Sequence, residues 1–129
     1  MSTIIVYSGG SNTAAVAEYI AQKTGGKAVT VQEASSVDME SFDRIIIGTR
    51  VRAGKVPSDL SEYISNNRKM IDERSPAFYL CCLYSGEKGR RQLEKISSEL
   101  GLPRCVYINK GKKAVKEADS PVDRFIDSL

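Results

Sequence analysis

Five short, largely apolar segments that alternate with polar or helix-patterned segments constrain the fold of this 129-residue chain more than any other feature. The segments are residues 3–6, 27–31, 42–48, 77–84 and 104–109. The third contains three consecutive isoleucines, and a strand that is apolar at every position is typical of a parallel sheet covered on both faces. The alternation, without a linker or an internal repeat, predicts one α/β domain over residues 1–129. We expect a three-layer, doubly wound sheet of five parallel strands in the order 2-1-3-4-5.

Apolar periodicity and end signals predict the helices between these strands. One helix is expected over residues 13–24, one over residues 57–71 with Pro57 in its first turn, one between residue 89 and Gly101, and a last one capped by Ser120. Residues 32–41 and 110–117 are predicted to be polar connections, the first with a short turn at 37–39 and the second rich in lysine.

Residues 8–13 are small and mostly hydroxylated, and they lie between the first strand and the first helix. The first turn of a helix has unpaired N–H groups and the positive end of the helix dipole, so it favours an anion such as a phosphate. An ordinary helix cap by Ser11 or Asn12 is the alternative. In a doubly wound sheet, ligands bind beyond the carboxyl ends of the strands, where residues 8–13, 49–56 and 84–89 are expected to meet. This placement favours the phosphate interpretation.

Composition excludes several kinds of site. The chain has no histidine, which excludes imidazole catalysis and the common zinc sites. Its three cysteines, without an export signal, indicate reduced thiols. The net charge of +3 is too small and too interspersed with acids to predict nucleic-acid binding. No apolar stretch approaches the ~20 residues of a membrane span and no signal peptide is evident, so we expect a cytoplasmic protein.

Residue types in the first loop exclude other occupants of this fold. A response regulator needs acidic residues there, a small cysteine phosphatase needs a cysteine and an arginine, and a P-loop needs a lysine. Residues 8–13 contain none of these residue types, and the Rossmann glycine motif is missing. What remains is a phosphate site built from backbone N–H groups and hydroxyls, without a fixed cation.

This loop resembles the FMN-phosphate loop of flavodoxins, usually written T/S-x-T/S-G-x-T, in length and position. Ser8, Asn12 and Thr13 fit that pattern, whereas Gly10 replaces a hydroxylated residue and Ser11 replaces the usual glycine. The resemblance implies that FMN is bound with its phosphate in this loop and its ring between the other two loops. The residues assigned to FMN in this way are Ser8, Gly9, Gly10, Ser11, Asn12, Thr13, Thr49, Arg50, Val51, Arg52, Ala53, Gly54, Tyr84, Ser85, Gly86 and Gly89.

The middle of the chain shows a narrower resemblance. Residues 42–48 and 75–79, with Arg52 and Gly54, are similar to the flavodoxin-domain group that contains menaquinone-dependent protoporphyrinogen oxidase. The similarity covers about half of the chain. That enzyme carries a long insertion after its fourth strand, whereas here residues 83–89 lead directly into the next helix.

Several residues in the second and third loops have two interpretations. Arg50, Arg52 and Lys55 form either a solvated basic loop or a charge that stabilises the reduced, anionic flavin and raises its potential. Gly54 either turns its peptide towards flavin N5 or makes a tight turn. Tyr84 either stacks on the ring or packs at the end of its strand.

The cysteines and the lysine run also have two interpretations. Cys81 and Cys82 are neighbours on a strand and point to opposite faces, so we expect buried thiols rather than a disulfide between them. The lysines at 110, 112, 113 and 116 form either a solvated edge or a surface for an acidic redox partner.

No side chain has the surroundings of a general acid, a base or a nucleophile, so no catalytic residue and no metal are expected. We interpret the chain as an FMN protein that carries electrons between redox partner proteins or to a small molecule such as a quinone. Whether it turns over a substrate stays open. The alternatives are a protoporphyrinogen-oxidase-like oxidoreductase and a cofactor-free interaction domain with the same fold.

Overall fold

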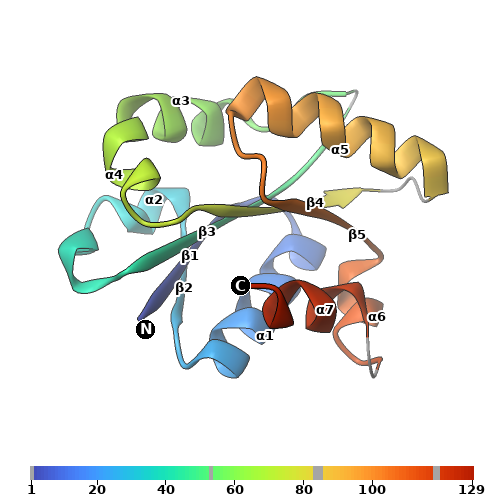
Figure 1. The fold of residues 1–129 in the computed structure, drawn as a ribbon, viewed down its shortest axis with the longest axis horizontal. Helices are drawn as coiled ribbons and strands as arrows, with labels where there is room; N and C mark the ends of the chain where they lie inside the picture. Colours follow the sequence, from blue (N-terminus) through green and yellow to red (C-terminus); the bar gives the residue numbers. More distant parts are fainter. Residues whose placement is uncertain (1, 53, 83–85, 118–119) are drawn as a thin grey trace.

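The computed structural model describes residues 2–52, 54–82, 86–117 and 120–129, whose arrangement is shown in Figure 1. One parallel sheet has the strand order β2-β1-β3-β4-β5. Its strands are β1 (Thr3–Ser8), β2 (Lys27–Thr30), β3 (Arg44–Arg50), β4 (Ala77–Cys82) and β5 (Cys105–Asn109). The predicted doubly wound α/β fold is therefore confirmed.

Helices cover both faces of the sheet (Figure 1). One face carries α2 (Val31–Ala34), α3 (Ser58–Asn66), α4 (Arg68–Asp72) and α5 (Gly86–Leu100). The other carries α1 (Ser11–Thr24), α6 (Gly111–Ala114) and α7 (Pro121–Asp127). A short 3₁₀ turn, η1 (Met39–Ser41), precedes β3. Among the described residues, no helix is both long and apolar enough to cross a lipid bilayer.

The consecutive isoleucines of β3 pack against the helices on both faces of the sheet. Ile45 and Ile47 pack into the core beneath α3 and α5, whereas Ile46 packs on the opposite face with the residues of α1. All three side chains are fully buried. Burial of each such side chain contributes about 1.5–3 kcal/mol. The apolar pattern of this strand thus determines the three-layer arrangement.

The helix predicted over residues 57–71 is divided into α3 and α4 at Asn67. The backbone of Asn67 leaves the helical region, with φ −123° and ψ 22°, and its Nδ2 donates to the Tyr63 carbonyl at 2.9 Å. An asparagine side chain that bonds to a backbone carbonyl in this way competes with the helical hydrogen bonds, which explains the break. The apolar periodicity continues across the break, so the sequence pattern alone predicts one helix.

Residues 31–34 and 111–114 form short helices where polar connections were predicted. Thr30 accepts the N–H of Glu33, and the Glu33 carboxylate accepts the N–H of Thr30, so a capping box starts α2. The Thr-x-x-Glu spacing is a sequence signal for this start. The cap predicted for the last helix is present, since Ser120 Oγ accepts the N–H of Asp123 at 3.3 Å.

Candidate functional site

The carboxyl ends of β1, β3 and β4 lie side by side at one edge of the sheet. Ser8 is paired with Thr49 between β1 and β3, and Arg50 with Cys81 between β3 and β4. A cavity of about 350 Å³ opens at this edge. It is lined by Gly10, Ser11, Asn12, Thr13, Arg50, Val51, Arg52, Cys81, Ile108, Lys110 and Gly111.

The helix α1 begins two residues earlier than predicted, and its first N–H groups have no hydrogen-bond partner among the residues that the structure describes. Gly10 occupies the N-cap position, and none of the described side chains caps the helix. The Ala14 N–H donates to the Gly10 carbonyl at 3.0 Å, so the N–H groups of Ser11, Asn12 and Thr13 precede the helical hydrogen bonds. The alternative of a cap by Ser11 or Asn12 is therefore wrong. These N–H groups and the helix dipole favour an anion at the cavity.

The two glycines of this loop differ in the space around them. A Cβ at Gly9 would lie 2.6 Å from Thr13 Oγ1 and 3.1 Å from Arg50 Cγ, so the packing requires glycine. A Cβ at Gly10 would have no atom within 4 Å. The position where flavodoxins have a hydroxylated residue is thus open enough to accept one here.

Thr13 has a buried hydroxyl without a partner. Its side chain belongs to a residue that is 1% exposed, and Oγ1 makes no hydrogen bond within the part of the chain that the structure describes. An unpaired buried hydroxyl costs about 1–3 kcal/mol. Because Thr13 lines the cavity next to the free N–H groups, an oxyanion there would supply the missing partner.

A buried tyrosine fixes the first turn of α1 to the sheet. Tyr79 in β4 is fully buried, and its hydroxyl donates to the Thr13 carbonyl at 2.9 Å. Burial raises the pKa of Tyr79 well above its usual value, so the hydroxyl stays a neutral donor. Gly48 is its neighbour in β3, and a Cβ at Gly48 would overlap the Tyr79 ring. Because Gly48 has no side chain, the Tyr79 ring fits beside it, and the Tyr79 hydroxyl can then hold Thr13 in place.

The hydroxyls of Ser8 and Thr49 are engaged within the fold. Thr49 Oγ1 donates to the Ser8 carbonyl at 2.8 Å, and Ser8 Oγ donates to Asp59 Oδ1 at 2.8 Å. Asp59 also accepts from Gln32 Nε2 and the Leu60 N–H, both at 2.8 Å. Burial acts to raise the pKa of Asp59, but these hydrogen bonds outweigh it and hold the pKa below its usual value. In this structure, Ser8 and Thr49 support the loop.

The segment after β5 packs against the start of α1. The sequence analysis did not predict this contact. Asn12 Oδ1 accepts the N–H of Lys112 at 2.9 Å. A Cβ at Gly111 would lie 2.7 Å from the Asn12 carbonyl oxygen, so only glycine allows this approach. Lys110 and Gly111 consequently line the cavity. A glycine two residues after a strand, at the edge where strand ends converge, is the signal that could have found them.

The second predicted loop, residues 49–56, begins later than predicted, because Thr49 and Arg50 are the last two residues of β3. Arg52 and Lys55 exchange two backbone hydrogen bonds of 2.9 Å, and Gly54 has φ +73°. Gly54 therefore makes the tight turn considered from the sequence. Arg50 and Arg52 line both the cavity and a neighbouring hollow of about 450 Å³ that also borders Ser8 and Gly9. Within the described ranges, the side chains of Arg50, Arg52 and Lys55 form no ion pair.

The third predicted loop is only partly described. Tyr84 and Ser85, like Ala53 in the second loop, lie outside the described residues. The prediction that residues 84–89 form one loop is wrong, because α5 begins at Gly86. Arg90 pairs with Glu87 and Glu94 along this helix, and such pairs favour its first turns.

Gly86 and Gly89 are therefore helical residues, and neither lines the cavity. Cys81 does line it and is buried, as predicted. Among the described residues, no group of three or more histidine, cysteine, aspartate or glutamate side chains could hold a metal ion.

A larger cavity, of about 720 Å³, lies along β5 and α7. Its lining includes Tyr107, Phe125 and Arg124 but no residue from the start of α1 or the end of β3. We place the candidate site in the smaller cavity, because the first N–H groups of α1 and the Thr13 hydroxyl, which have no partner within the described ranges, converge there.

Comparisons with known proteins agree with this fold. A family model described as a flavodoxin domain matches residues 3–119. Oxidised Flavodoxin 2 from Bacillus cereus is 18% identical, with a TM-score of 0.64 over 99% of this chain and 94% of that chain. A flavodoxin from the domain Archaea is 17% identical, with a TM-score of 0.62 over 98% of this chain and 95% of that chain. No curated protein matches the sequence.

A larger protein contains a similar domain. Rubredoxin oxygen:oxidoreductase from Desulfovibrio gigas is 10% identical, with a TM-score of 0.64, and it covers 98% of this chain. The chain spans about a third (33%) of that protein. At these identities the structural likenesses show the fold alone. They do not support the narrower resemblance to the protoporphyrinogen oxidase group.

Proposed function

Because the chain belongs to the flavodoxin domain family, we propose that it binds FMN at the start of α1 and carries electrons between redox partners. The observation that carries this proposal is the buried hydroxyl of Thr13, which has no partner among the described residues, beside a first turn of α1 that no described side chain caps. A phosphate presents several acceptor oxygens to such donors, and the helix dipole favours its charge. The residues present therefore fit the phosphate end of FMN.

The protein's own part is to hold FMN and to set its surroundings. The N–H groups of the first turn and the Thr13 hydroxyl would bind the phosphate, and Val51 and Arg52 would border the ring. Bound FMN supplies the electron-transfer chemistry, whereas the chain controls its orientation, its access to water and the charge around it. We further propose a cytoplasmic location, and partners that are either redox proteins or a small molecule such as a quinone.

The binding proposal is tested by mixing the purified protein with FMN and measuring the flavin absorbance that stays with it through gel filtration. Reversible reduction of the retained flavin would support the redox role. Gly9→Val is the matched control, because a side chain at Gly9 collides with Thr13 and Arg50 and should abolish retention. A wild-type protein that leaves the column colourless would instead favour a cofactor-free interaction domain.

Gly10→Thr should strengthen FMN binding by about threefold to tenfold, the effect of one additional hydrogen bond worth about 1 kcal/mol. The position has open space and a φ of −88°, so a side chain fits without strain. Fluorescence titration of wild type and variant measures the change, with Gly10→Ala as the control that adds a side chain without a hydroxyl. Equal affinities of the Thr and Ala variants would contradict a phosphate beside this position.

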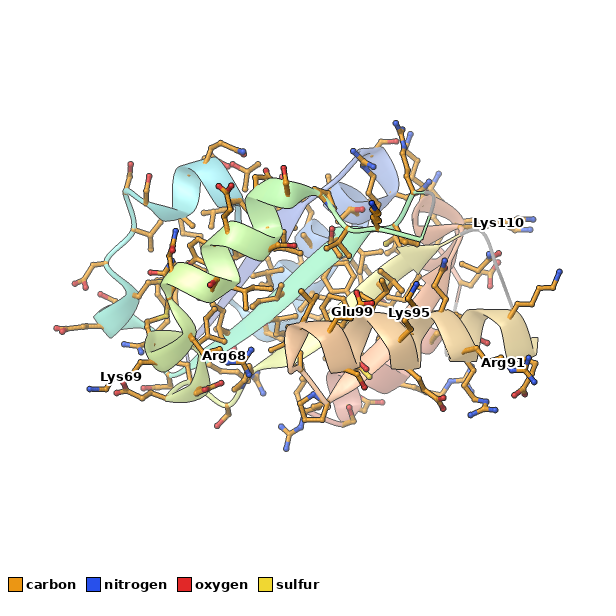
Figure 2. The ribbon with its side chains drawn as sticks, turned by 90° about the horizontal axis from the view of Figure 1, so that it is seen from above. Arg68, Lys69, Arg91, Lys95, Glu99 and Lys110 are labelled. Atoms are coloured by element: carbon orange, nitrogen blue, oxygen red, sulfur yellow. The ribbon has the colours of Figure 1, made fainter. Side chains whose placement is uncertain are left out.

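Arg52→Ala should lower the reduction potential of bound FMN, because an unpaired cation near the ring stabilises the reduced, anionic flavin. A redox titration of the FMN-loaded proteins measures the shift. Lys69→Ala is the control, since Lys69 lies on α4 at the far end of the molecule from the cavity lysine Lys110 (Figure 2). An unchanged potential in Arg52→Ala would leave only the solvated-loop interpretation of this arginine.

A further inference from the structure

Two cations from other strands lie beside a loop that has none of its own. Residues 8–13 contain no lysine or arginine, yet Arg50 at the end of β3 and Lys110 after β5 both line the cavity with Gly10 and Thr13. In Figure 2 Lys110 lies at the end of the sheet towards which the strands point, away from Arg68 and Lys69. The fold thus brings positive charge to the first turn of α1.

Contacts of the neighbouring residues hold the backbone of Lys110 in place. Lys110 itself has φ +53°, an unusual conformation for a lysine, and it turns the chain out of β5. The next residue, Gly111, is buried against Asn12, and the Lys112 N–H donates to Asn12 Oδ1 at 2.9 Å. Lys110 is therefore held between the end of the sheet and the first turn of α1.

Arg50 packs against the loop of residues 8–13 through Gly9. Its Cγ lies 3.1 Å from the position that a Cβ at Gly9 would occupy, so its aliphatic stem crosses the glycine of the loop. In the part of the chain that is described, neither Arg50 nor Lys110 forms an ion pair with a carboxylate. Both charges are available to a ligand.

We propose that Lys110 and Arg50 make this cavity selective for the dianion of a phosphate monoester. The N–H groups of the first turn and the Thr13 hydroxyl supply direct hydrogen bonds, and the two cations supply the charge that stabilises the second negative charge of the phosphate. The identification of that monoester as FMN rests on the proposed function. The consequence is a preference for FMN over riboflavin that depends on Lys110 and Arg50.

The test compares the affinities of FMN and riboflavin for wild type, Lys110→Ala and Arg50→Met. Methionine keeps the apolar stem that packs on Gly9 and removes the charge. Each variant should bind FMN about tenfold more weakly than wild type, corresponding to about 1.4 kcal/mol, and bind riboflavin unchanged. Lys116→Ala is the control, because Lys116 is exposed on the same segment but does not line the cavity.

Three outcomes would overturn the proposal: an unchanged FMN affinity in both cavity variants, an equal loss of affinity for FMN and riboflavin, or an equal loss of FMN affinity in Lys116→Ala.

If wild type binds neither flavin, the proposed function fails, and inorganic phosphate becomes the probe. Shifts in the amide signals of residues 10–13 that are present in wild type and absent in Lys110→Ala would then still support the anion site. No shift with phosphate would overturn it.

Discussion

Gly48→Ala should destabilise the protein by about 3 kcal/mol, at the upper end of the usual range for overpacking a core. The reason is that a Cβ at this position overlaps the ring of Tyr79, which is fully buried and bonded to the Thr13 carbonyl. Either the ring moves and loses that hydrogen bond, or the two strands separate. Urea unfolding followed by circular dichroism measures the loss.

Gly10→Ala is the matched control for this prediction, because its side chain meets no atom within 4 Å. We expect its stability to change by at most about 0.5 kcal/mol. The double variant Gly48→Ala, Tyr79→Ala should lose less than the sum of its single changes, since removing the ring removes the collision. Equal unfolding midpoints for Gly48→Ala and wild type would refute the packing described for this pair.

Thr13→Val should have opposite effects on stability and on FMN binding. Valine has the same shape without the hydroxyl, and that hydroxyl is buried without a partner, so the free energy of unfolding of the FMN-free protein should stay the same or rise by about 1 kcal/mol. FMN affinity should fall about tenfold or more, because a hydrogen bond to a charged phosphate is worth about 1.5–3 kcal/mol. Denaturant unfolding and fluorescence titration measure the two quantities.

Thr49→Val is the control for Thr13→Val. The Thr49 hydroxyl donates to the Ser8 carbonyl, so removing it should cost about 1–3 kcal/mol of stability. A Thr13→Val protein that is as destabilised as Thr49→Val, with an unchanged FMN affinity, would show that the Thr13 hydroxyl has a structural partner and no role towards a ligand.

The strand order and the location of the candidate site could be predicted from local patterns. Continuous apolar runs such as residues 45–47 are typical of a parallel sheet that helices cover on both faces, and that fold places its ligands at the carboxyl edge. Ser11, Asn12 and Thr13 could be named as candidates because the start of a helix after the first strand is a local feature. Of the predicted residues that the structure describes, seven line the cavity, all from the first two loops.

The remaining features of the site depend on contacts between distant segments. The role of Gly48 follows from its register with Tyr79, and the positions of Gly111 and Lys110 follow from the packing of α6 on Asn12. That the Thr13 hydroxyl has no hydrogen-bond partner among the described residues can be recognised only when its surroundings are known. Ser8 fits the loop pattern, but its hydroxyl is engaged by Asp59 from α3, which the pattern does not contain.

Amide chemical-shift mapping with FMN tests the central claim most directly, because it reports where the ligand lies as well as whether it binds. We predict that FMN shifts the backbone signals of residues 9–13, 50–52 and 110–112, which surround the smaller cavity. Riboflavin should shift fewer signals at residues 10–13 than FMN, because it lacks the phosphate. Shifts confined to the larger cavity along β5 and α7, or no shifts at saturating FMN, would contradict the account.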